Sequence, residues 1–174
     1  MIQIRKAIPS DTDGIEKLYS DVCDHLDAHE NFPGWKKGIY PAREDAENGI
    51  RNNSLFSVLE NGETVASFML DHNAEDGYKS VPWLTKSDYA RIYVLHTLAV
   101  RPDHLQRGIG TKILEYAESF AKKERCLSIR LDIVHGNTPA EKLYRKNGYE
   151  FIATVSLGRE KFGLPLFDLY EKVL

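Results

Sequence analysis

Two closely spaced glycines, Gly108 and Gly110, lie between an apolar run that ends at Val100 and a helical pattern. The N-terminus of a helix presents backbone N–H groups without intrahelical partners, and together with the helix dipole these groups bind phosphate. A glycine lets a ligand approach such a backbone closely, because it has no side chain. Side-chain donors flank the pair at Gln106, Arg107 and Thr111. The segment by itself fits a cradle for a phosphorylated ligand or an ordinary loop-to-helix turn.

Two common nucleotide cradles do not fit this segment. A P-loop needs glycine at position 105 and then, directly after Gly110, Lys followed by Ser or Thr. Position 105 is not glycine, and Thr111 comes before Lys112. A dinucleotide-binding turn needs a small residue where this chain has Ile113, and it has no room for the long connection from Val100. The sequence therefore disfavours a nicotinamide-dependent dehydrogenase.

The glycine segment resembles a motif of the GCN5-related N-acetyltransferase (GNAT) family, Gln/Arg-x-x-Gly-x-Gly/Ala, which follows the fourth strand and binds acetyl-CoA. Both glycines match, and the segment departs from the motif only at Leu105. A second segment resembles the family's Asn-x-x-Ala-x-x-x-Tyr-x-x-x-Gly-Phe/Tyr motif at five positions: Asn137, Ala140, Tyr144, Gly148 and Tyr149. The two motifs in this order, one helix and one strand apart, are more specific than either alone.

The resemblance implies that acetyl-CoA is the donor substrate. The strand that ends Leu98-Ala99-Val100 would hold the pantetheine arm through its main chain, and a bulge would splay this strand from its neighbour. The backbone N–H of Leu98 would polarise the thioester carbonyl, and such a donor is typically worth ~2.7–4 kcal/mol. The same side chains also suit a buried core, and the two roles are compatible. The implied contacts of the cradle are Leu105, Gln106, Arg107, Gly108, Ile109, Gly110 and Thr111.

Tyr144 matches the family's general acid toward the departing sulfur. A phenol has a reference pKa of ~10, so it is protonated at neutral pH and can donate. The alternative is a tyrosine that packs in the core. Asn137 matches a position that contacts the cofactor, and as an alternative or in addition it would cap the last helix.

A primary amine must lose a proton before it attacks, because its reference pKa is ~10.4. His96, two residues before Leu98, is the candidate base, since histidine titrates near neutral pH. A chain of water molecules and a packed, structural histidine are the alternatives, and Tyr93 and His135 are weaker candidates for the base. His25 and His29 have the i, i+4 spacing of zinc ligands but lack a third ligand, so no metal site is expected.

The patterns predict strands at 2–8, 54–60, 63–71, 91–100, 126–134, 149–157 and 165–174. Helices are predicted at 10–29, 42–52, 110–123 and 138–147, with Ser10 or Asp11 as the first N-cap and Gly148 closing the last helix. Asn61-Gly62 predicts a tight hairpin. Residues 31–41 and 72–90 read as loops, and the length of the second is typical of functional loops.

Composition indicates an ordinary globular protein of 174 residues, with 42% hydrophobic and 28% charged residues. The net charge of −3 argues against nucleic-acid and anionic-membrane partners. No apolar run has the length of a signal peptide or membrane span, so a cytoplasmic location is expected. Cys23 and Cys126 form no CxxC pair, and we expect buried thiols.

We therefore expect one α/β domain over residues 1–174, with a mixed, mostly antiparallel sheet of about seven strands and about four helices on both faces. The expected activity is acetyl transfer from acetyl-CoA to a primary amine by direct attack in a ternary complex. A non-catalytic acyl-CoA-binding regulatory module is the alternative. The acceptor is a small molecule or peptide. Phe32, Trp35 and Tyr40 would wall its pocket or close over the core. A cationic amine would be attracted by acidic residues that surface solvation explains equally well: Asp27, Glu30, Asp71, Glu75 and Asp76. A homodimer is compatible with this family.

Overall fold

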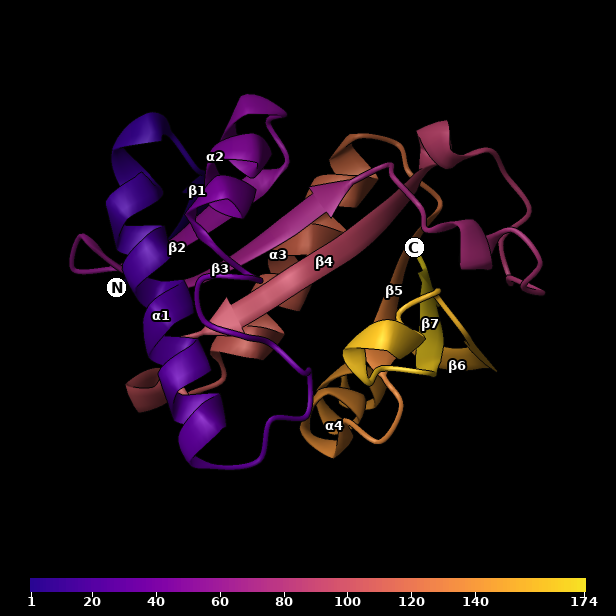
Figure 1. Ribbon diagram of the computed structural model, residues 1–174. Coiled ribbons are helices and arrows are strands. Elements are labelled where there is room, and N and C mark those ends of the chain that lie inside the picture. Colours follow the sequence, from indigo (N-terminus) through magenta and orange to yellow (C-terminus); the bar gives the residue numbers. More distant parts are fainter. The chain divides into compact units, whose positions relative to one another are not determined.

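The computed structural model describes residues 1–174, which form seven strands and four α-helices (Figure 1). Hydrogen-bonded neighbours give the strand order β1-β2-β3-β4-β5-β7-β6. Strand β4 pairs with β5 in parallel, whereas the β1–β2, β2–β3, β5–β7 and β6–β7 pairs are antiparallel. The predicted fold class, a mixed α/β sheet with about four helices, is confirmed.

The chain divides into two compact units. The first unit comprises Met1–Asn31, Trp35–Leu70 and His96–Ile113, and the second comprises Phe32–Gly34, Asp71–Leu95 and Leu114–Leu174. Strand β4 (Ile92–Val100) and helix α3 (Ile109–Lys123) therefore contribute residues to both units. The single domain expected over residues 1–174 stays a prediction.

The first unit contains β1 (Ile2–Lys6), α1 (Thr12–Ala28), α2 (Arg43–Arg51), β2 (Leu55–Glu60) and most of β3 (Glu63–Asp71). Helices α1 and α2 lie side by side against the strands of this unit (Figure 1). Apolar residues recur along α1 every three or four positions, and this spacing buries one face of the helix. They pack with residues of α2, β2 and β4 in one core cluster: Ile15, Leu18, Tyr19, Val22, Ala46, Leu55 and Ala99.

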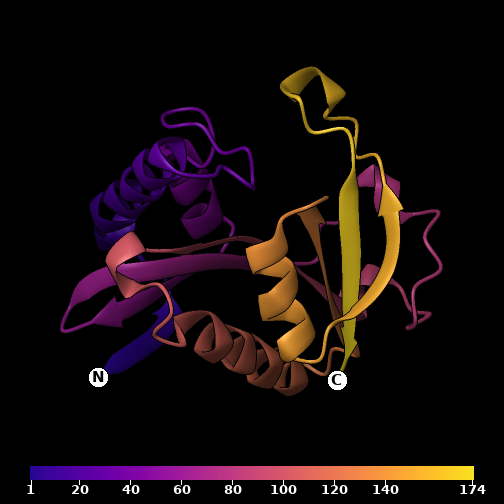
Figure 2. The same cartoon turned by 90° about the horizontal axis from the view of Figure 1, so that it is seen from below.

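The second unit contains β5 (Ser128–Val134), α4 (Thr138–Lys146), β6 (Glu150–Val155) and β7 (Phe167–Val173). Strands β6 and β7 form a hairpin with a long connection that carries the short helix η5 (Glu160–Phe162) (Figure 2). The β6–β7 register shifts between Phe151 and Ala153, so β6 is irregular at the outer edge of this unit.

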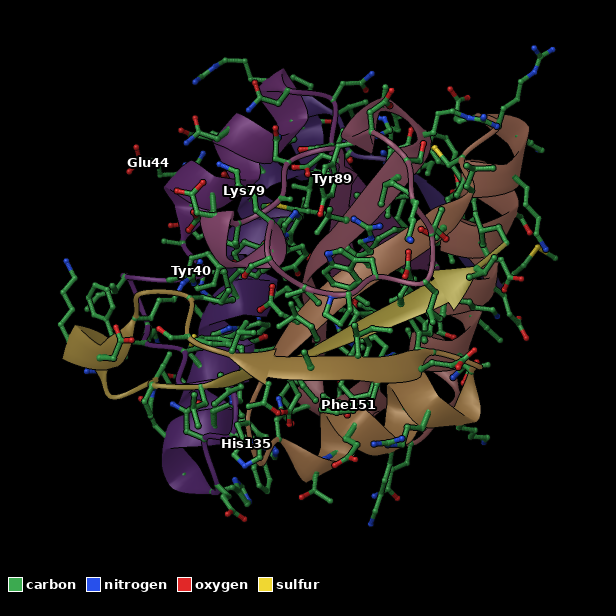
Figure 3. All side chains as sticks on the ribbon, turned by 90° about the vertical axis from the view of Figure 1, so that its right-hand side faces the viewer. Tyr40, Glu44, Lys79, Tyr89, His135 and Phe151 are labelled. Atoms are coloured by element: carbon green, nitrogen blue, oxygen red, sulfur yellow. The ribbon has the colours of Figure 1, made fainter.

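Residues 72–90, predicted as a loop, belong to the second unit, and a few buried contacts fix them there. With Arg91, the segment contains two short 3-10 helices, η2 (Asp76–Tyr78) and η3 (Tyr89–Arg91), and Figure 3 shows Lys79 and Tyr89 on it. Tyr78 is fully buried, and the backbone N–H groups of Leu84 and Thr85 donate to the buried carboxylate of Glu171. We call residues 72–91 the strap.

A buried ion pair fixes the strap to the sheet. The Nε of Arg130 lies 3.1 Å from Glu171 Oε1, and both side chains are almost fully buried. The other two nitrogens of Arg130 donate to the Tyr89 hydroxyl and to the Thr85 carbonyl, at 2.8 and 2.6 Å. The Arg130 guanidinium also lies 4.3 Å from the centre of the Trp83 ring. Each charged atom is thus hydrogen-bonded, as burial of an ion pair requires.

The hairpin at Asn61-Gly62 is confirmed, because both residues have positive φ, 52° and 83°, as a type I′ turn demands. Helix α4 ends as predicted, with Gly148 at φ 83° directly after the C-cap Asn147. Both cysteines are buried free thiols, also as predicted.

Several predicted boundaries need correction. Strand β1 ends at Lys6 because the Ile8 N–H donates to Asp11 rather than to the sheet. Asp11 does occupy the cap position of α1, but its carboxylate binds Arg5 and the Ile8 N–H instead of capping the helix. Strand β5 begins at Ser128 because the Cys126 N–H donates to the Ala121 carbonyl at the end of α3.

Candidate functional site

Strand β4 changes conformation at Thr97, in the part that belongs to the first unit. Thr97 has a φ of 47°, in the left-handed region that a β-branched residue rarely adopts. Such a residue interrupts the regular strand and reorients the peptide groups after it, as bulges do beside active sites. The structure therefore has a break one residue before Leu98, where the resemblance implies a bulge. Ala99 is buried, and its side chain packs in the core cluster.

The Tyr40 side chain reaches this break from the connection between α1 and α2. Its hydroxyl lies 2.5 Å from Thr97 Oγ1. The connection is itself fixed, because the Asn31 amide donates to the Trp35 carbonyl and accepts the Trp35 N–H, at 2.7 and 3.1 Å. The rings of Trp35 and Tyr40 meet edge to face, 6.3 Å between centres. Tyr40, expected as a wall of an acceptor pocket, is thus also tied to β4.

Charged side chains anchor the chain between β4 and the glycines. The Arg101 guanidinium donates to Asp103 and Glu63, at 2.7 and 3.3 Å, and the Arg101 N–H donates to the Val65 carbonyl. The buried His104 ring has Nδ1 2.6 Å from Asp103 and Nε2 3.0 Å from Glu60. Hydrogen bonds from Arg101 and then His104 lower the pKa of Asp103 to about 2. The short helix η4 (Pro102–His104) is therefore held to the β2–β3 hairpin.

The loop that follows is exposed and carries two left-handed residues. Gln106 has a φ of 61° and Gly108 a φ of 75°, and a Cβ added at Gly108 would meet nothing within 4 Å. Left-handed residues that alternate with others turn successive N–H groups to one side, which makes an anion-binding concavity. The Lys112 N–H donates to the Gly108 carbonyl, so the helical hydrogen bonds of α3 begin directly at the glycine loop. The residues present fit a pyrophosphate.

In the second unit, the parallel register of β4 with β5 runs only from Ile92 opposite Ser128 to Val94 opposite Arg130. Residues Leu131 to Val134 of β5 continue to pair with β7. The ladder between β4 and β5 thus ends before the candidate residues of β4. Asp132 lies on this part of β5, and the Tyr78 hydroxyl donates to it at 2.6 Å.

Helix α4 positions Asn137 and Tyr144 in the second unit. Asn137 caps the helix, because its side chain accepts the Ala140 N–H at 3.3 Å. Tyr144 is 6% exposed and packs edge to face with Tyr149. Burial, and then the charge of Asp132, raise the pKa of the Tyr144 phenol, so it carries its proton at neutral pH. The structure thus shows the alternatives named for both residues, a helix cap at Asn137 and a packed tyrosine at 144, and their contacts with acetyl-CoA stay predictions.

The remaining predicted residues differ in their surroundings. His96 lies on β4 directly before Thr97 and is partly buried. Burial raises the pKa of Tyr93 to about 12, so this residue is unsuited to act as a base. His29 donates through Nδ1 to the His25 carbonyl, and the two rings stack. Among the acids expected to attract an amine, Glu75 pairs with Arg159 and Asp76 with Lys79.

Among the contacts of the candidate site residues, two were not foreseen from the sequence. One joins Tyr40 to Thr97, and the other joins His135 to Asp168, whose oxygens both lie 3.0 Å from the His135 Nδ1. Each joins residues at least 33 positions apart, so no local pattern predicts it.

None of the helices combines the length and the apolar character needed to cross a lipid bilayer.

Comparisons with known proteins agree with these features. Over 97 residues, or 55% of this chain, 31% are identical to the uncharacterized N-acetyltransferase YhfO of Bacillus subtilis (strain 168). Over 127 residues, or 71% of this chain, 30% are identical to the uncharacterized N-acetyltransferase YesJ of the same organism. The matched regions span 65% of the length of each of these two relatives.

A solved structure has the same fold. The crystal structure of a GNAT-family acetyltransferase from Streptococcus agalactiae superposes with a TM-score of 0.82, covering 99% of this chain and 95% of that chain at 21% identity. The family model described as "Acetyltransferase (GNAT) family" matches residues 20–149, well over half of the chain. The chain therefore belongs to the GNAT acetyltransferase family.

Proposed function

We propose that this protein transfers the acetyl group of acetyl-CoA to a primary amine of a small molecule or peptide. The observation that carries the proposal is the exposed loop with left-handed Gln106 and Gly108, which opens into α3 and can cradle a pyrophosphate. Family membership supports the same donor, because acetyl-CoA is the typical acetyl donor of this family.

The state of the two cysteines supports direct attack in a ternary complex rather than a covalent acetyl-enzyme. Burial raises the pKa of both Cys23 and Cys126, so neither thiol is poised to form a covalent acetyl-enzyme. The amine nitrogen forms its bond to the thioester carbon, the carbon–sulfur bond breaks, and the sulfur takes the proton of Tyr144. The proton that the amide nitrogen loses returns through solvent to the Tyr144 oxygen.

Other residues are assigned by motif. The backbone of Leu98, Ala99 and Val100 binds the pantetheine arm, and the Leu98 N–H polarises the thioester carbonyl. Asn137 adds a contact from the start of α4. The sequence offers His96 or a chain of waters as the route for the proton that the ammonium form of the acceptor must lose. The cradle residues are Leu105, Gln106, Arg107, Gly108, Ile109, Gly110 and Thr111.

The first experiment is a thermal-shift measurement with acetyl-CoA, CoA, NAD and ATP in parallel. At ~100 times the Kd a ligand stabilises the fold by about 2.7 kcal/mol, which raises Tm by roughly 5–10 °C for a domain of this size. We expect shifts with acetyl-CoA and CoA only. If neither acetyl-CoA nor CoA raises Tm, the proposal that the glycine loop binds the cofactor is contradicted.

The second experiment measures release of the CoA thiol with a panel of primary amines. Tyr144→Phe is expected to lower kcat by ~10²-fold while the thermal shift with acetyl-CoA persists, since general acids contribute roughly that factor. Binding of acetyl-CoA without turnover on any amine would favour the regulatory module instead. Wild-type kcat in Tyr144→Phe would remove the acid role.

A further inference from the structure

A chain of hydrogen bonds crosses three neighbouring strands of the second unit and ends at an exposed imidazole. The Thr154 hydroxyl on β6 donates to Asp168 Oδ1 on β7, at 2.6 Å. Both oxygens of Asp168 lie 3.0 Å from Nδ1 of His135, which directly follows β5. Asp168 is 7% exposed. A backbone hydrogen bond also fixes His135, because its N–H donates to the Leu166 carbonyl at 3.0 Å.

The two nitrogens of His135 have different surroundings. A carboxylate at Nδ1 accepts the proton of that nitrogen, which leaves the lone pair on Nε2 and orients the ring. The side chain of His135 is 59% exposed, whereas that of Asp168 is 10% exposed. This is the arrangement of an oriented general base.

The position of His135 relates it to the proposed chemistry. It lies between β5 and the cap of α4, the helix that carries Tyr144, and Figure 3 shows it beside the first turn of that helix. It also follows the part of β5 that lies beyond the ladder with β4. Asp168 is the charged group that faces the ring. On α4, the helix that follows, Arg145 donates to Glu141 at 2.8 Å.

We propose that His135, oriented by Asp168, takes the proton from the ammonium form of the acceptor, in place of His96. In this step one N–H bond of the ammonium breaks, an N–H bond forms at Nε2, and the positive charge moves to the imidazole. Solvent later removes that proton. Asp168 is a positioning residue. The inference rests on the proposed acetyl transfer.

The experiment compares three histidine-to-asparagine variants by kcat/KM as a function of pH, with the best amine of the panel. His135→Asn keeps a donor for Asp168 but has no base, so the fold is preserved. We expect a ~10²-fold loss at pH 7 and no acidic limb in its profile, because general bases contribute roughly 10²–10⁴-fold. His29→Asn, a surface histidine, is the matched control and should keep the wild-type profile. An acidic limb that is lost in His96→Asn and kept in His135→Asn would overturn the inference.

A second arm changes the acceptor. Methoxyamine is already neutral at pH 7, so it needs no base before it attacks. The deficit of His135→Asn should therefore shrink by at least roughly tenfold with methoxyamine relative to an alkylamine. An equal deficit with both amines would mean that His135 serves the fold and not proton transfer.

A third arm needs no turnover. The ¹⁵N NMR signals of the His135 ring should show the proton on Nδ1 in the wild type, and Asp168→Asn should abolish that preference. A proton on Nε2 in the wild type would contradict the proposal. Failure of the acetyl transfer itself is recognised separately: the wild type would then release no CoA with any amine. If the wild type turns over and His135→Asn matches it at every pH, only the present inference fails.

Discussion

The strap and the glycine loop are both connections beside the sheet, and they are built in opposite ways. The strap, residues 72–91, is fixed by a buried carboxylate, a buried guanidinium and the buried ring of Tyr78. The glycine loop exposes Gln106 and Gly108, and its charged anchors, Arg101 and His104, lie before it.

The difference separates structural from functional use of polar groups. In the strap each polar partner is satisfied within the protein, so a change there leaves a buried charge or donor unpaired and acts on stability. In the glycine loop the backbone faces outward and an added Cβ meets no neighbour, so a change there acts on what can approach. Length alone does not make a connection functional: the longer strap is the structural one.

The largest effect is expected in the strap. Glu171→Leu leaves the Arg130 guanidinium buried without its carboxylate, and such a loss costs about 3–5 kcal/mol. The measurement is the midpoint of urea unfolding. The double variant Arg130→Met with Glu171→Leu removes both charges and should be more stable than Glu171→Leu alone. A single variant that unfolds within about 1 kcal/mol of the wild type would show that the strap is not held by this pair.

The next effect belongs to the glycine loop. Gly108→Ala places a Cβ at φ 75°, where a left-handed alanine costs roughly 1–2 kcal/mol, and the methyl group would stand where a pyrophosphate approaches. Gly163, with φ 76° and open space around its Cβ, is the matched control. Gly108→Ala and Gly163→Ala should lose similar stability. Only Gly108→Ala should bind acetyl-CoA more weakly, roughly tenfold or more, as measured by calorimetry. Equal affinity of the two variants for acetyl-CoA would contradict the proposal that the glycine loop binds the pyrophosphate.

A smaller effect is expected where a connection touches β4. Tyr40→Phe removes a hydroxyl from the strained Thr97, and one hydrogen bond is worth about 1 kcal/mol, or about fivefold in kcat/KM. Thr97→Val should cause a similar loss, and the double variant should lose no more than either single one. Additive losses would show that the two hydroxyl groups act separately.

The smallest effect at neutral pH concerns Arg5 and Asp11, an ion pair of intermediate burial. Burial opposes ionisation of Asp11, but hydrogen bonds from Arg5 and the Ile8 N–H outweigh it, and the pKa of Asp11 lies below its ordinary value. A lowered folded pKa gives stability that is present above the unfolded pKa of ~3.9 and lost as the pH falls through the folded pKa. Asp11→Asn should therefore flatten the loss of stability below about pH 4, measured by urea midpoints against pH. If Asp11→Asn loses stability at low pH as steeply as the wild type does, other carboxylates cause that loss.

The parts predictable from sequence are those with a local cause. The helical spacing of Ile15, Leu18 and Val22 gives α1 because one face must be buried, and Asn61-Gly62 gives the hairpin because both accept a positive φ. The glycine loop could be singled out because its two glycines match a family motif before a helix, and its role as a cradle stays a prediction. Family membership followed from two motifs in order, and it is confirmed.

The parts that escaped have distant causes. The Arg130–Glu171 pair joins residues 41 positions apart, so a strap held by it reads as a plain loop in the sequence. Thr97 is a good strand former, and only its tertiary surroundings impose a left-handed φ. Asp11 has the sequence position of a helix cap, yet Arg5 and Ser57 bring its carboxylate to the sheet side instead.

The outermost strands of the sheet, β1 and β6, bear on how the sheet could pair with another extended chain. An edge strand offers unpaired N–H and C=O groups to any other extended chain, and charges or bulges on the edge discourage such pairing. Strand β1 is short and ends in Arg5 and Lys6, and β6 begins at Glu150 and loses its register between Phe151 and Ala153. The same irregularity that makes β6 a poor strand thus protects the chain against edge-to-edge aggregation.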